Sequence, residues 1–343
     1  MMRRVPKRRT SLLSTTTRRS HLTSVLEALQ GAQKIVVVTH VQPDGDAIGT
    51  SLGLAHALRG MGKQVDVAVD RGVPEYLRFL PGWEQVHAEL STGEWDVLIS
   101  ADSSDVERTG ECGRYARAHS KFEINLDHHA TNTQFGDIQI VVPEAVSASE
   151  VAYDMLTASG IPISPDAAKS LLTGLVTDTM GFRTSNVSPR TLQIAQDLMK
   201  HGASLTEITS RSLDTRSYDS LLVWREALTH LALDDGVIYT LVPFDVFRRL
   251  RIDPALDLSL SSFLVTVSEA MVSATFKELH DGRVELSLRS KLGFDVSQVA
   301  YKLGGGGHVQ ASGATIDGPL DDAVNRVLPL LKDVVRAGKL IVR

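Results

Sequence analysis

The sequence predicts an α/β protein. We expect an N-terminal domain with a mostly parallel sheet flanked by helices, a long connector helix, and a smaller C-terminal α+β domain with a largely antiparallel sheet. In the first half, short and almost continuously apolar runs alternate with helical patterns, as in strands that are buried on both faces of a parallel sheet. In the second half, the strand-like runs alternate between apolar and polar residues, which is typical of antiparallel strands with one solvated face. A length of 343 residues suits two domains.

The first strand is expected at residues 34–40, where a β-branched run ends in polar residues. A helix follows over residues 46–60, because apolar residues recur there three and four positions apart. Four further short apolar runs are predicted strands, at residues 64–69, 95–102, 122–127 and 138–142. Helical patterns then cover residues 147–156, 165–180 and 188–200. The last of these opens with Ser188 as N-cap and Pro189 at the first helical position.

A long polar helix is predicted over residues 205–233, between the two domains. Strand-like runs follow at residues 237–242, 272–278 and 284–289, and helical patterns at 260–271, 296–303 and 320–335. We therefore predict four segments in the chain. They are a basic disordered tail at residues 1–20, an N-terminal domain at 21–204, the connector helix at 205–233, and a C-terminal domain at 234–343.

Charge is distributed unevenly along the chain. The first twenty residues hold seven arginines and lysines and no acidic residue, and the rest of the chain holds 29 basic and 41 acidic residues, a net charge of −12. The composition of the leader fits a disordered tail with weak affinity for nucleic acid, which we favour, and also an organelle transit peptide. An acidic body cannot attract polyanions through its overall field. Any phosphate site must therefore be neutralised locally, by arginines or metal ions.

Two further features bear on the compartment. Cys112 is the only cysteine, which rules out a disulfide within the chain and fits a reducing cytosol. We expect this thiol to be buried or incidental. No stretch approaches the ~18 consecutive apolar residues of a transmembrane helix. The sequence therefore predicts a cytoplasmic protein that makes no contact with a membrane.

Acidic and histidine residues gather where the predicted strands end. His40, Asp44 and Asp46 follow the first strand, Asp102 ends the strand at 95–102, and the run Asp127-His128-His129 ends the strand at 122–127. Asp178 lies in a helical stretch. Because ligands of open parallel sheets bind at the carboxyl ends of the strands, we expect these side chains to converge. Carboxylates together with imidazoles suit a divalent ion such as Mn²⁺.

Each of these residues has an ordinary interpretation when taken alone. His40 could cap a strand end, Asp46 could be a helix N-cap, and Asp102 could be a turn residue. Four carboxylates packed together, however, repel one another unless cations lie between them. Two ions about 3.5–4 Å apart can clamp the attacking and leaving oxygens of a phosphoryl transfer. The joint pattern therefore predicts a two-metal hydrolase of phosphate esters.

The motifs resemble those of a known family. His40-x3-Asp44-x-Asp46, the isolated Asp102, the triplet Asp127-His128-His129 and the late Asp178 look like the four motifs of DHH phosphoesterases. Gly304-Gly305-Gly306-Gly307-His308-x2-Ala311-Ser312-Gly313 looks like the signature of the DHH-associated C-terminal domain. The match spans roughly residues 30–316. It is most similar to the nanoRNase group, bifunctional oligoribonucleases and 3′-phosphoadenosine 5′-phosphate phosphatases, some of whose actinobacterial relatives act on cyclic di-AMP or its linear product pApA.

The resemblance implies a role for each motif. One metal would be held by His40, Asp44 and Asp102, and the other by Asp46, Asp102, His128 and Asp178. Asp102 would bridge the ions, Asp127 would orient the histidines, and His129 would face the substrate. The catalytic residues would then be Asp102, His128 and His129. The expected substrate contacts, besides His129, are Arg108, Asn132, Arg289, Ser290, Gly305, Gly306, Gly307 and His308.

The implied activity is hydrolysis of short oligoribonucleotides, 3′-phosphoadenosine 5′-phosphate and pApA, with cyclic di-AMP as a further candidate, by a metal-bridged hydroxide. Two Mn²⁺ ions are expected, with Mg²⁺ or Co²⁺ as alternatives, in a homodimer that does not bind long duplex nucleic acid. Three alternatives stay open: a manganese-dependent inorganic pyrophosphatase, an exonuclease of long single strands, and a binding protein that senses a nucleotide. Aromatic residues make up only 5% of the chain, which leaves few platforms for stacking a long strand.

Overall fold

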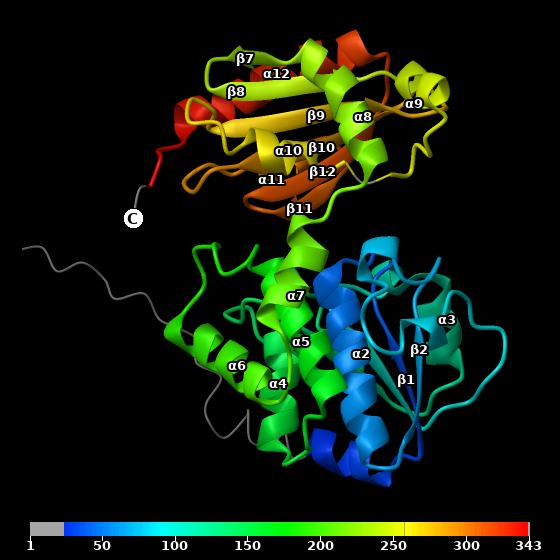
Figure 1. The fold of residues 1–343 in the computed structure, drawn as a ribbon. Helices are drawn as coiled ribbons and strands as arrows, with labels where there is room; N and C mark the ends of the chain where they lie inside the picture. Colours follow the sequence, from blue (N-terminus) through cyan, green and yellow to red (C-terminus); the bar gives the residue numbers. More distant parts are fainter. Residues whose placement is uncertain (1–23, 257, 342–343) are drawn as a thin grey trace, which may run out of the picture. The chain divides into compact units, whose positions relative to one another are not determined.

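The computed structural model describes residues 24–256 and 258–341. The chain divides into two compact units between Thr215 and Arg216, and each unit is built around one six-stranded sheet (Figure 1). The predicted order, a parallel α/β sheet followed by a mostly antiparallel one, is confirmed. The basic tail predicted at residues 1–20 lies outside the described residues. Among residues 24–256 and 258–341, no helix is long and apolar enough to cross a membrane.

The sheet of the first unit is parallel throughout and has the order β3-β2-β1-β4-β5-β6. Its strands are β1 (Lys34–Val38), β2 (Gln64–Ala68), β3 (Val86–His87), β4 (Val97–Ala101), β5 (Glu123–Asp127) and β6 (Ile138–Val141). Five of the six were predicted, and β3 is only two residues long. The strand order reverses between β1 and β4, which is where open α/β sheets bind their ligands.

Helices cover both faces of this sheet. A helical stretch ends at Gly31 and is followed by α2 (Gly45–Gly60), α3 (Gly110–Ala118), α4 (Ala148–Ala158), α5 (Pro165–Asp178), α6 (Pro189–Lys200) and α7 (Leu205–Thr209). Short turns of helix lie at Glu75–Leu77, Trp83–Gln85, Glu107–Thr109 and Ser210–Asp214. Figure 1 shows α2, α4 and α5 side by side. The predicted N-cap Ser188 and the proline after it are present in α6.

Alternate residues of β1 point to opposite faces of the sheet. Ile35 and Val37 join the large core with α2, α4 and α5. Val36 and Val38 pack on the other face with Cys112 of α3. This thiol is buried, as expected, and burial raises its pKa to about 12. Both faces of the central strand are therefore apolar, which explains the continuous run Lys34–Val38.

Helices α2 and α5 approach each other closely because glycines line their contact. A Cβ atom on Gly49 of α2 would lie 2.5 Å from the carbonyl oxygen of Ser170 and 2.8 Å from the amide nitrogen of Gly174, both on α5. Real Cβ atoms do not reach such distances from backbone atoms. The glycine at this position therefore sets the separation of two helices that carry Asp46 and Asp178.

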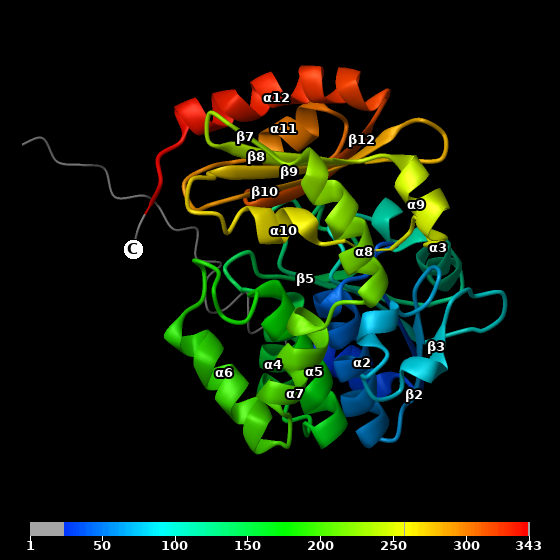
Figure 2. The same ribbon diagram turned by 45° about the horizontal axis from the view of Figure 1, so that its top comes forward.

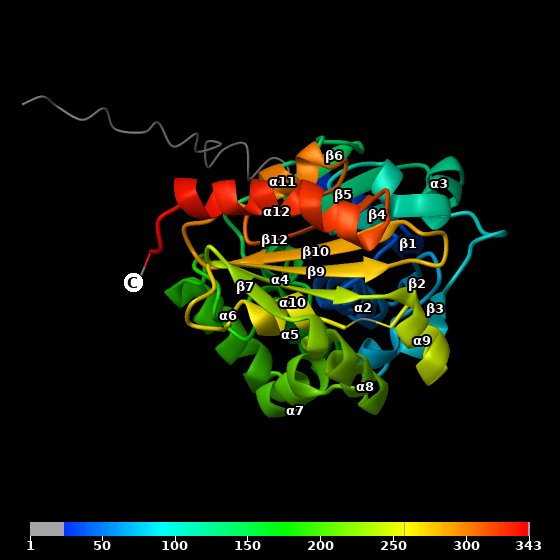
Figure 3. The same ribbon diagram turned by 90° about the horizontal axis from the view of Figure 1, so that it is seen from above.

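The sheet of the second unit has the order β11-β12-β10-β9-β8-β7, and only its β8–β9 pair is parallel. Its strands are β7 (Ala232–Asp234), β8 (Val237–Val242), β9 (Val272–Glu278), β10 (Val284–Ser290), β11 (Gly306–His308) and β12 (Ala311–Ile316). Its helices are α8 (Tyr218–Ala227), α9 (Phe244–Leu250), α10 (Leu260–Leu264), α11 (Ser297–Lys302) and α12 (Leu320–Ala337), with a short turn at Leu228–His230. Figures 2 and 3 show α12 on one face of this sheet, and α8 and α10 pack on the other.

Two predicted helices differ from the structure. The connector helix expected over 205–233 is interrupted, because α7 and its terminal turn end at Asp214, Thr215 is extended, and Ser217 starts α8 as a new N-cap. The chain passes from one unit to the other at this break. The helix expected over 260–271 ends at Leu264. The apolar residues that follow Leu264 belong to turns that pack against the sheet.

Replacing Gly49 with alanine should lower the free energy of unfolding by about 1–3 kcal/mol, because the added methyl group must push α2 and α5 apart. The matched control is Gly60→Ala in the same helix, where a Cβ atom meets nothing within 4 Å. That variant should be neutral or stabilised by up to about 1 kcal/mol, through its higher helix propensity. Urea unfolding of the metal-free proteins measures both values. Equal stability of the two variants would contradict the close helix crossing.

Candidate metal centre

The six candidate ligands lie at the carboxyl edge of the parallel sheet or at the adjoining helix ends. His40 follows β1, Asp102 follows β4 directly, and His128 follows β5. Asp44 and Asp46 lie at the start of α2, and Asp178 is the last residue of α5. Because β1, β4 and β5 are neighbours in the sheet, their ends meet. Segments that are far apart in the sequence thus bring their polar side chains to one place.

Three overlapping groups of side chains form one cluster, and in each group the ligand atoms lie within 4.8 Å of one another. The groups are His40 with Asp44 and Asp102, Asp46 with His128 and Asp178, and Asp102 with His128 and His129. Nε2 of His128 lies 3.6 Å from Oδ1 of Asp102, 3.6 Å from Oδ2 of Asp178 and 3.9 Å from Oδ2 of Asp46. Nε2 of His40 lies 3.6 Å from the other oxygen of Asp102. Asp102 therefore lies between the two sides of the cluster.

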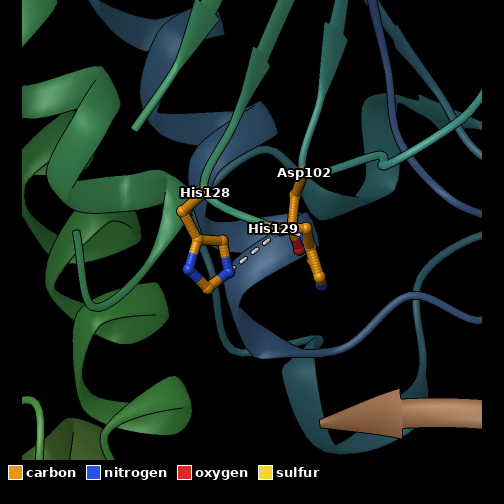
Figure 4. A group of neighbouring side chains, drawn as sticks. All are labelled: Asp102, His128 and His129. Carbon is orange, nitrogen blue, oxygen red and sulfur yellow. Dashed lines mark ion pairs between the residues drawn. The ribbon is translucent and has the colours of Figure 1, made fainter. Parts of the chain in front are cut away.

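Asp102 has an unusual backbone conformation. Its φ angle is +53°, in the left-handed region that few residues other than glycine adopt, and aspartate is among those that tolerate it. Its N–H group donates to the carbonyl oxygen of Leu126, 2.8 Å away, so the residue remains tied to β5. Figure 4 shows Asp102 and His128 at the ends of neighbouring strands, with their ion pair dashed. Left-handed backbone at such a position is typical of functional sites.

Asp127 and Asn132 hold His129 in place. Nδ1 of His129 lies 2.8 Å from Oδ1 of Asp127, and Nδ2 of Asn132 donates to the other oxygen of Asp127 at 2.6 Å. Asp127 is fully buried, so this chain of contacts fixes the imidazole orientation. Asn132 also donates to Ser103 and Asn125. Its amide nitrogen is thus engaged within the protein, and the substrate contact of Asn132 stays a prediction.

The ionisation of the cluster reflects crowding of negative charge. Burial and the neighbouring Asp102 carboxylate raise the pKa of Asp46 to about 7. Burial and the charges of Asp46 and Asp44 also raise the pKa of Asp178 well above its usual value. Burial alone would raise the pKa of Asp102, but the contact with His40 and the charges of the nearby histidines lower it. The cluster thus holds protons where cations would otherwise neutralise it.

The histidines show the complementary effect. Burial opposes protonation of His128, but the carboxylates of Asp102 and Asp46 raise its pKa. For His129, burial is likewise outweighed by the hydrogen bond with Asp127 and the charge of Asp102, so its pKa is raised. Both shifts have the same origin as those of Asp46 and Asp178. The site attracts positive charge.

The donor set suits divalent metal ions. Nδ1 of His40, Oδ1 of Asp102 and Oγ1 of Thr39 are buried and have no hydrogen-bond partner among the residues that the structure describes. Such atoms are costly unless something else binds them. Carboxylate oxygens combined with imidazole nitrogens suit Mn²⁺ and similar ions. Asp102 belongs to two of the three groups and connects the His40 side of the cluster with the His128 side.

The remaining candidates lie in different places. Arg108 is half-buried near the first strand end, where its carbonyl oxygen accepts a hydrogen bond from Val41. In the second unit, Arg289 and Ser290 end β10, and the hydroxyl of Ser290 donates to the carbonyl oxygen of Phe294. The predicted glycine loop is the short strand β11, in which Gly306, Gly307 and His308 are exposed. Gly305 precedes it.

Two of these glycines are needed for packing. A Cβ atom on Gly305 would lie 2.1 Å from the carbonyl oxygen of Gly313, and one on Gly307 would lie 2.5 Å from that of Ala311. Both oxygens belong to β12, the partner strand. A Cβ atom on Gly306, by contrast, would meet nothing within 4 Å. Close strand pairing therefore requires glycine at positions 305 and 307. No packing contact requires glycine at position 306.

Sequence reasoning missed the residues that surround Asp46. The hydroxyl of Thr50 and the backbone amides of Ala148 and Ser149 all donate to its carboxylate. Thr50 lies one helical turn after Asp46, so that helical spacing could have suggested this contact. Nothing in the sequence connects Ser149 with Asp46, because the two residues are 103 positions apart.

Between about pH 5 and pH 8, the metal-free protein should lose stability as the pH rises. Asp46 and Asp178 keep protons in the folded state that unfolded aspartates have lost, and His128 and His129 bind theirs more tightly than unfolded histidines do. The folded state therefore binds more protons, and the free energy of unfolding falls with increasing pH. Mn²⁺ should flatten this slope because the ions displace the protons. Urea unfolding in EDTA and in Mn²⁺ tests both statements, and a metal-free slope of opposite sign would contradict them.

Family models match both units in the order that the sequence motifs predicted. The DHH family, N-terminal domain, matches residues 34–175, and the DHHA1 domain matches residues 259–337. The matched parts include five of the six candidate ligands, and Asp178 follows three residues after the first match ends.

Similar proteins align with most of this chain. The bifunctional oligoribonuclease and PAP phosphatase NrnA of Thermus thermophilus is 35% identical over 323 residues, 92% of this chain and 94% of the relative. The protein of the same name from Bacillus subtilis is 27% identical over 86% of this chain and 93% of the relative. The crystal structure of an exopolyphosphatase-related protein from Bacteroides fragilis superposes with a TM-score of 0.86 at 26% identity, covering 93% of this chain and 98% of that one. Because a relative that is 35% identical covers 92% of the chain and both domain models match, this protein belongs to the DHH family.

Proposed function

We propose that this protein is a two-metal phosphoesterase that hydrolyses short oligoribonucleotides and small nucleotides. The observation that supports this most directly is the single cluster formed by His40, Asp44, Asp46, Asp102, His128 and Asp178. Relatives that align with most of this chain are named for oligoribonuclease and PAP phosphatase activity. A further relative, from Geobacillus thermodenitrificans, is named a cyclic-di-AMP phosphodiesterase, and 91% of this chain aligns with 49% of it. We therefore include 3′-phosphoadenosine 5′-phosphate, pApA and cyclic di-AMP among the substrates.

The ligands divide between two ions. His40, Asp44 and Asp102 would hold one Mn²⁺ ion, and Asp46, Asp102, His128 and Asp178 the other, with Mg²⁺ or Co²⁺ as substitutes. Bound ions of this kind lower the pKa of water and neutralise phosphoryl oxygens. The protein keeps the carboxylates close enough to share the charge of the ions. The low pKa of Asp102 keeps this residue ionised, as a bridging ligand must be.

His129 acts on the substrate in this proposal. Its bond to Asp127 fixes the ring, and we assign Nε2 to the phosphate or the leaving oxygen. The raised pKa of His129 favours the protonated imidazole, which suits contact with an anion and donation of a proton to a leaving group. In the second unit, Arg289, Ser290, His308 and the amides of β11 would bind the nucleotide.

The proposal also covers the compartment, the oligomeric state and the size of the substrate. The protein would act in the cytoplasm, as a homodimer, on substrates of a few nucleotides. An inorganic pyrophosphatase is the rival within this chemistry. A relative from Streptococcus thermophilus, named a probable manganese-dependent inorganic pyrophosphatase, is 29% identical over 51% of this chain and 57% of the relative. The more extensive match to the oligoribonucleases favours nucleotides. A nucleotide sensor without turnover has no need of a complete set of metal ligands.

Replacing Asp102 with alanine should lower kcat on a short oligoribonucleotide and on 3′-phosphoadenosine 5′-phosphate by about a thousand-fold or more. The ions supply several kcal/mol of transition-state stabilisation, and each 1.4 kcal/mol is a factor of ten. Asp154→Ala removes an equal charge from an exposed ion pair with Arg190 and should keep full activity. The assay compares both variants with the wild type in saturating Mn²⁺. Wild-type turnover in Asp102→Ala would refute the two-metal assignment, and preferred turnover of pyrophosphate by the wild type would favour the rival.

Replacing Gly306 with alanine should raise KM for the nucleotide substrates while leaving folding unchanged. The added methyl group meets no protein atom, but it would keep a phosphate away from the β11 amides. Gly307→Ala is the contrasting variant, because its φ of +133° and its contact with β12 make the substitution strained, so that it should lower stability. Steady-state kinetics and thermal unfolding separate the two effects. An unchanged KM in Gly306→Ala would exclude close approach of the substrate at this residue.

A further inference from the structure

The carboxylate of Asp46 is held by the protein on both of its oxygens. The backbone N–H of Ala148 donates to Oδ2 at 2.6 Å, and that of Ser149 donates to Oδ1 at 3.0 Å. These amides belong to the first turn of α4, where N–H groups lack partners within the helix. Asp46 is only 1% exposed, so water does not compete for these bonds. Rotation of the carboxylate would break both of them.

A pair of buried hydroxyl groups supports the same carboxylate. Oγ1 of Thr50 donates to Oδ1 of Asp46 at 3.2 Å and lies 2.7 Å from Oγ of Ser149. Thr50 is on α2 and Ser149 is on α4, and both are buried. Within this pair, one hydroxyl can donate to the other while a proton remains for the carboxylate. The pair therefore links two helices through the ligand that they share.

Gly174 of α5 leaves the space that this arrangement needs. A Cβ atom at Gly174 would lie 2.1 Å from Oγ of Ser149 and 2.5 Å from Oδ1 of Asp46. These are ends of side chains, which can rotate away, whereas a Cβ atom on Gly49 would meet backbone atoms. Substitution at Gly174 would thus displace the ligand, and substitution at Gly49 would displace a helix. Gly174 and Gly49 line the same contact between α2 and α5. Gly174 leaves space for the side chains around Asp46, and Gly49 sets the separation of the helices.

We infer that Thr50, Ser149 and Gly174 are positioning residues for Asp46, which fix the direction of its carboxylate toward the ion that it shares with His128 and Asp178. The inference rests on the proposed two-metal function. Oδ1 of Asp46 accepts from the Ser149 amide and the Thr50 hydroxyl, whereas Oδ2 accepts only from the Ala148 amide. Oδ2, which lies 3.9 Å from Nε2 of His128, would therefore be the oxygen available to an ion. Loss of either hydroxyl removes a restraint on Oδ1 and leaves the two backbone bonds alone to hold the carboxylate. Partners of this kind typically contribute 10–100-fold to metal affinity or activity.

The test compares Thr50→Val and Ser149→Ala with Ser51→Ala. Ser51 is the matched control because it is also buried on α2, but its hydroxyl donates only to the carbonyl oxygen of Ala47. Calorimetric titration of the metal-free proteins with Mn²⁺ measures the affinity and number of ions, and urea unfolding in EDTA measures stability. Thr50→Ser, which keeps the hydroxyl, tests rescue. Gly174→Ala completes the set.

We expect Thr50→Val, Ser149→Ala and Gly174→Ala to weaken binding of one of the two ions about 10–100-fold. Thr50→Ser and Ser51→Ala should bind Mn²⁺ as the wild type does. Excess Mn²⁺ should restore kcat in Ser149→Ala, which a merely structural defect would not allow. The double variant Thr50→Val/Ser149→Ala should lose less affinity than the single effects predict together, because the two hydroxyls act as a unit.

Two results would overturn the inference in different ways. If the wild type binds two ions and hydrolyses nucleotides, but Ser149→Ala and Gly174→Ala bind Mn²⁺ as tightly as Ser51→Ala does, the positioning role is wrong and the proposed function stands. If the wild type itself binds no Mn²⁺, the proposed function fails and the inference fails with it. Loss of affinity matched by an equal loss of stability in EDTA would also overturn it, because the hydroxyls would then serve the fold alone.

Discussion

Repulsion among the carboxylates of Asp44, Asp46, Asp102 and Asp178 is the constraint on which the site depends. Two unit charges 4 Å apart repel by about 4 kcal/mol at an effective dielectric constant of 20, so a protein does not gather four of them without compensation. In this chain the compensation is visible in the raised pKa values of Asp46, Asp178, His128 and His129, all of which favour bound protons. Divalent ions relieve the same repulsion without protonation, which is why metal binding and the stability of this unit are linked.

The ends of neighbouring strands and helices hold these carboxylates together against their repulsion. The strand order reverses between β1 and β4, so that the loops after them lead away in opposite directions and leave their ends accessible. The glycine contact fixes α2 against α5, and thereby Asp46 against Asp178. Strained backbone gathers at the same edge: Asp102, Met180 and Phe182 all have φ angles between +51° and +63°. Such conformations persist only where the surrounding structure determines them.

The sequence was most informative where one physical rule acts alone. Buried parallel strands need continuous apolar runs, and their ends define one edge, so β1, β4 and β5 and the ligands after them could be predicted. The strands β11 and β12 could not be predicted from the sequence. A glycine-rich run has no alternating pattern, and its extended form depends on the pairing of β11 with β12 and of β12 with β10. The break near Thr215 was hidden by polar residues that suit both a helix and a linker. The contact between Thr50 and Ser149 spans 99 positions, and each residue alone is an ordinary helical residue.

The candidate ligands differ in burial across the cluster, and the burial of each carboxylate determines which groups can hold it. Asp46 is buried, so its oxygens must be satisfied by the protein, and amides and hydroxyls from two helices do so. Asp44 is exposed, and its Oδ1 only caps its own helix by accepting from Asp46 and Ala47. Asp178 is intermediate, with 23% of its side chain exposed. In the proposed function a phosphate would therefore reach the cluster from the exposed side, at Asp44 and Asp178. The buried side, held around Asp46 by amides and hydroxyls, would keep the geometry of the site constant.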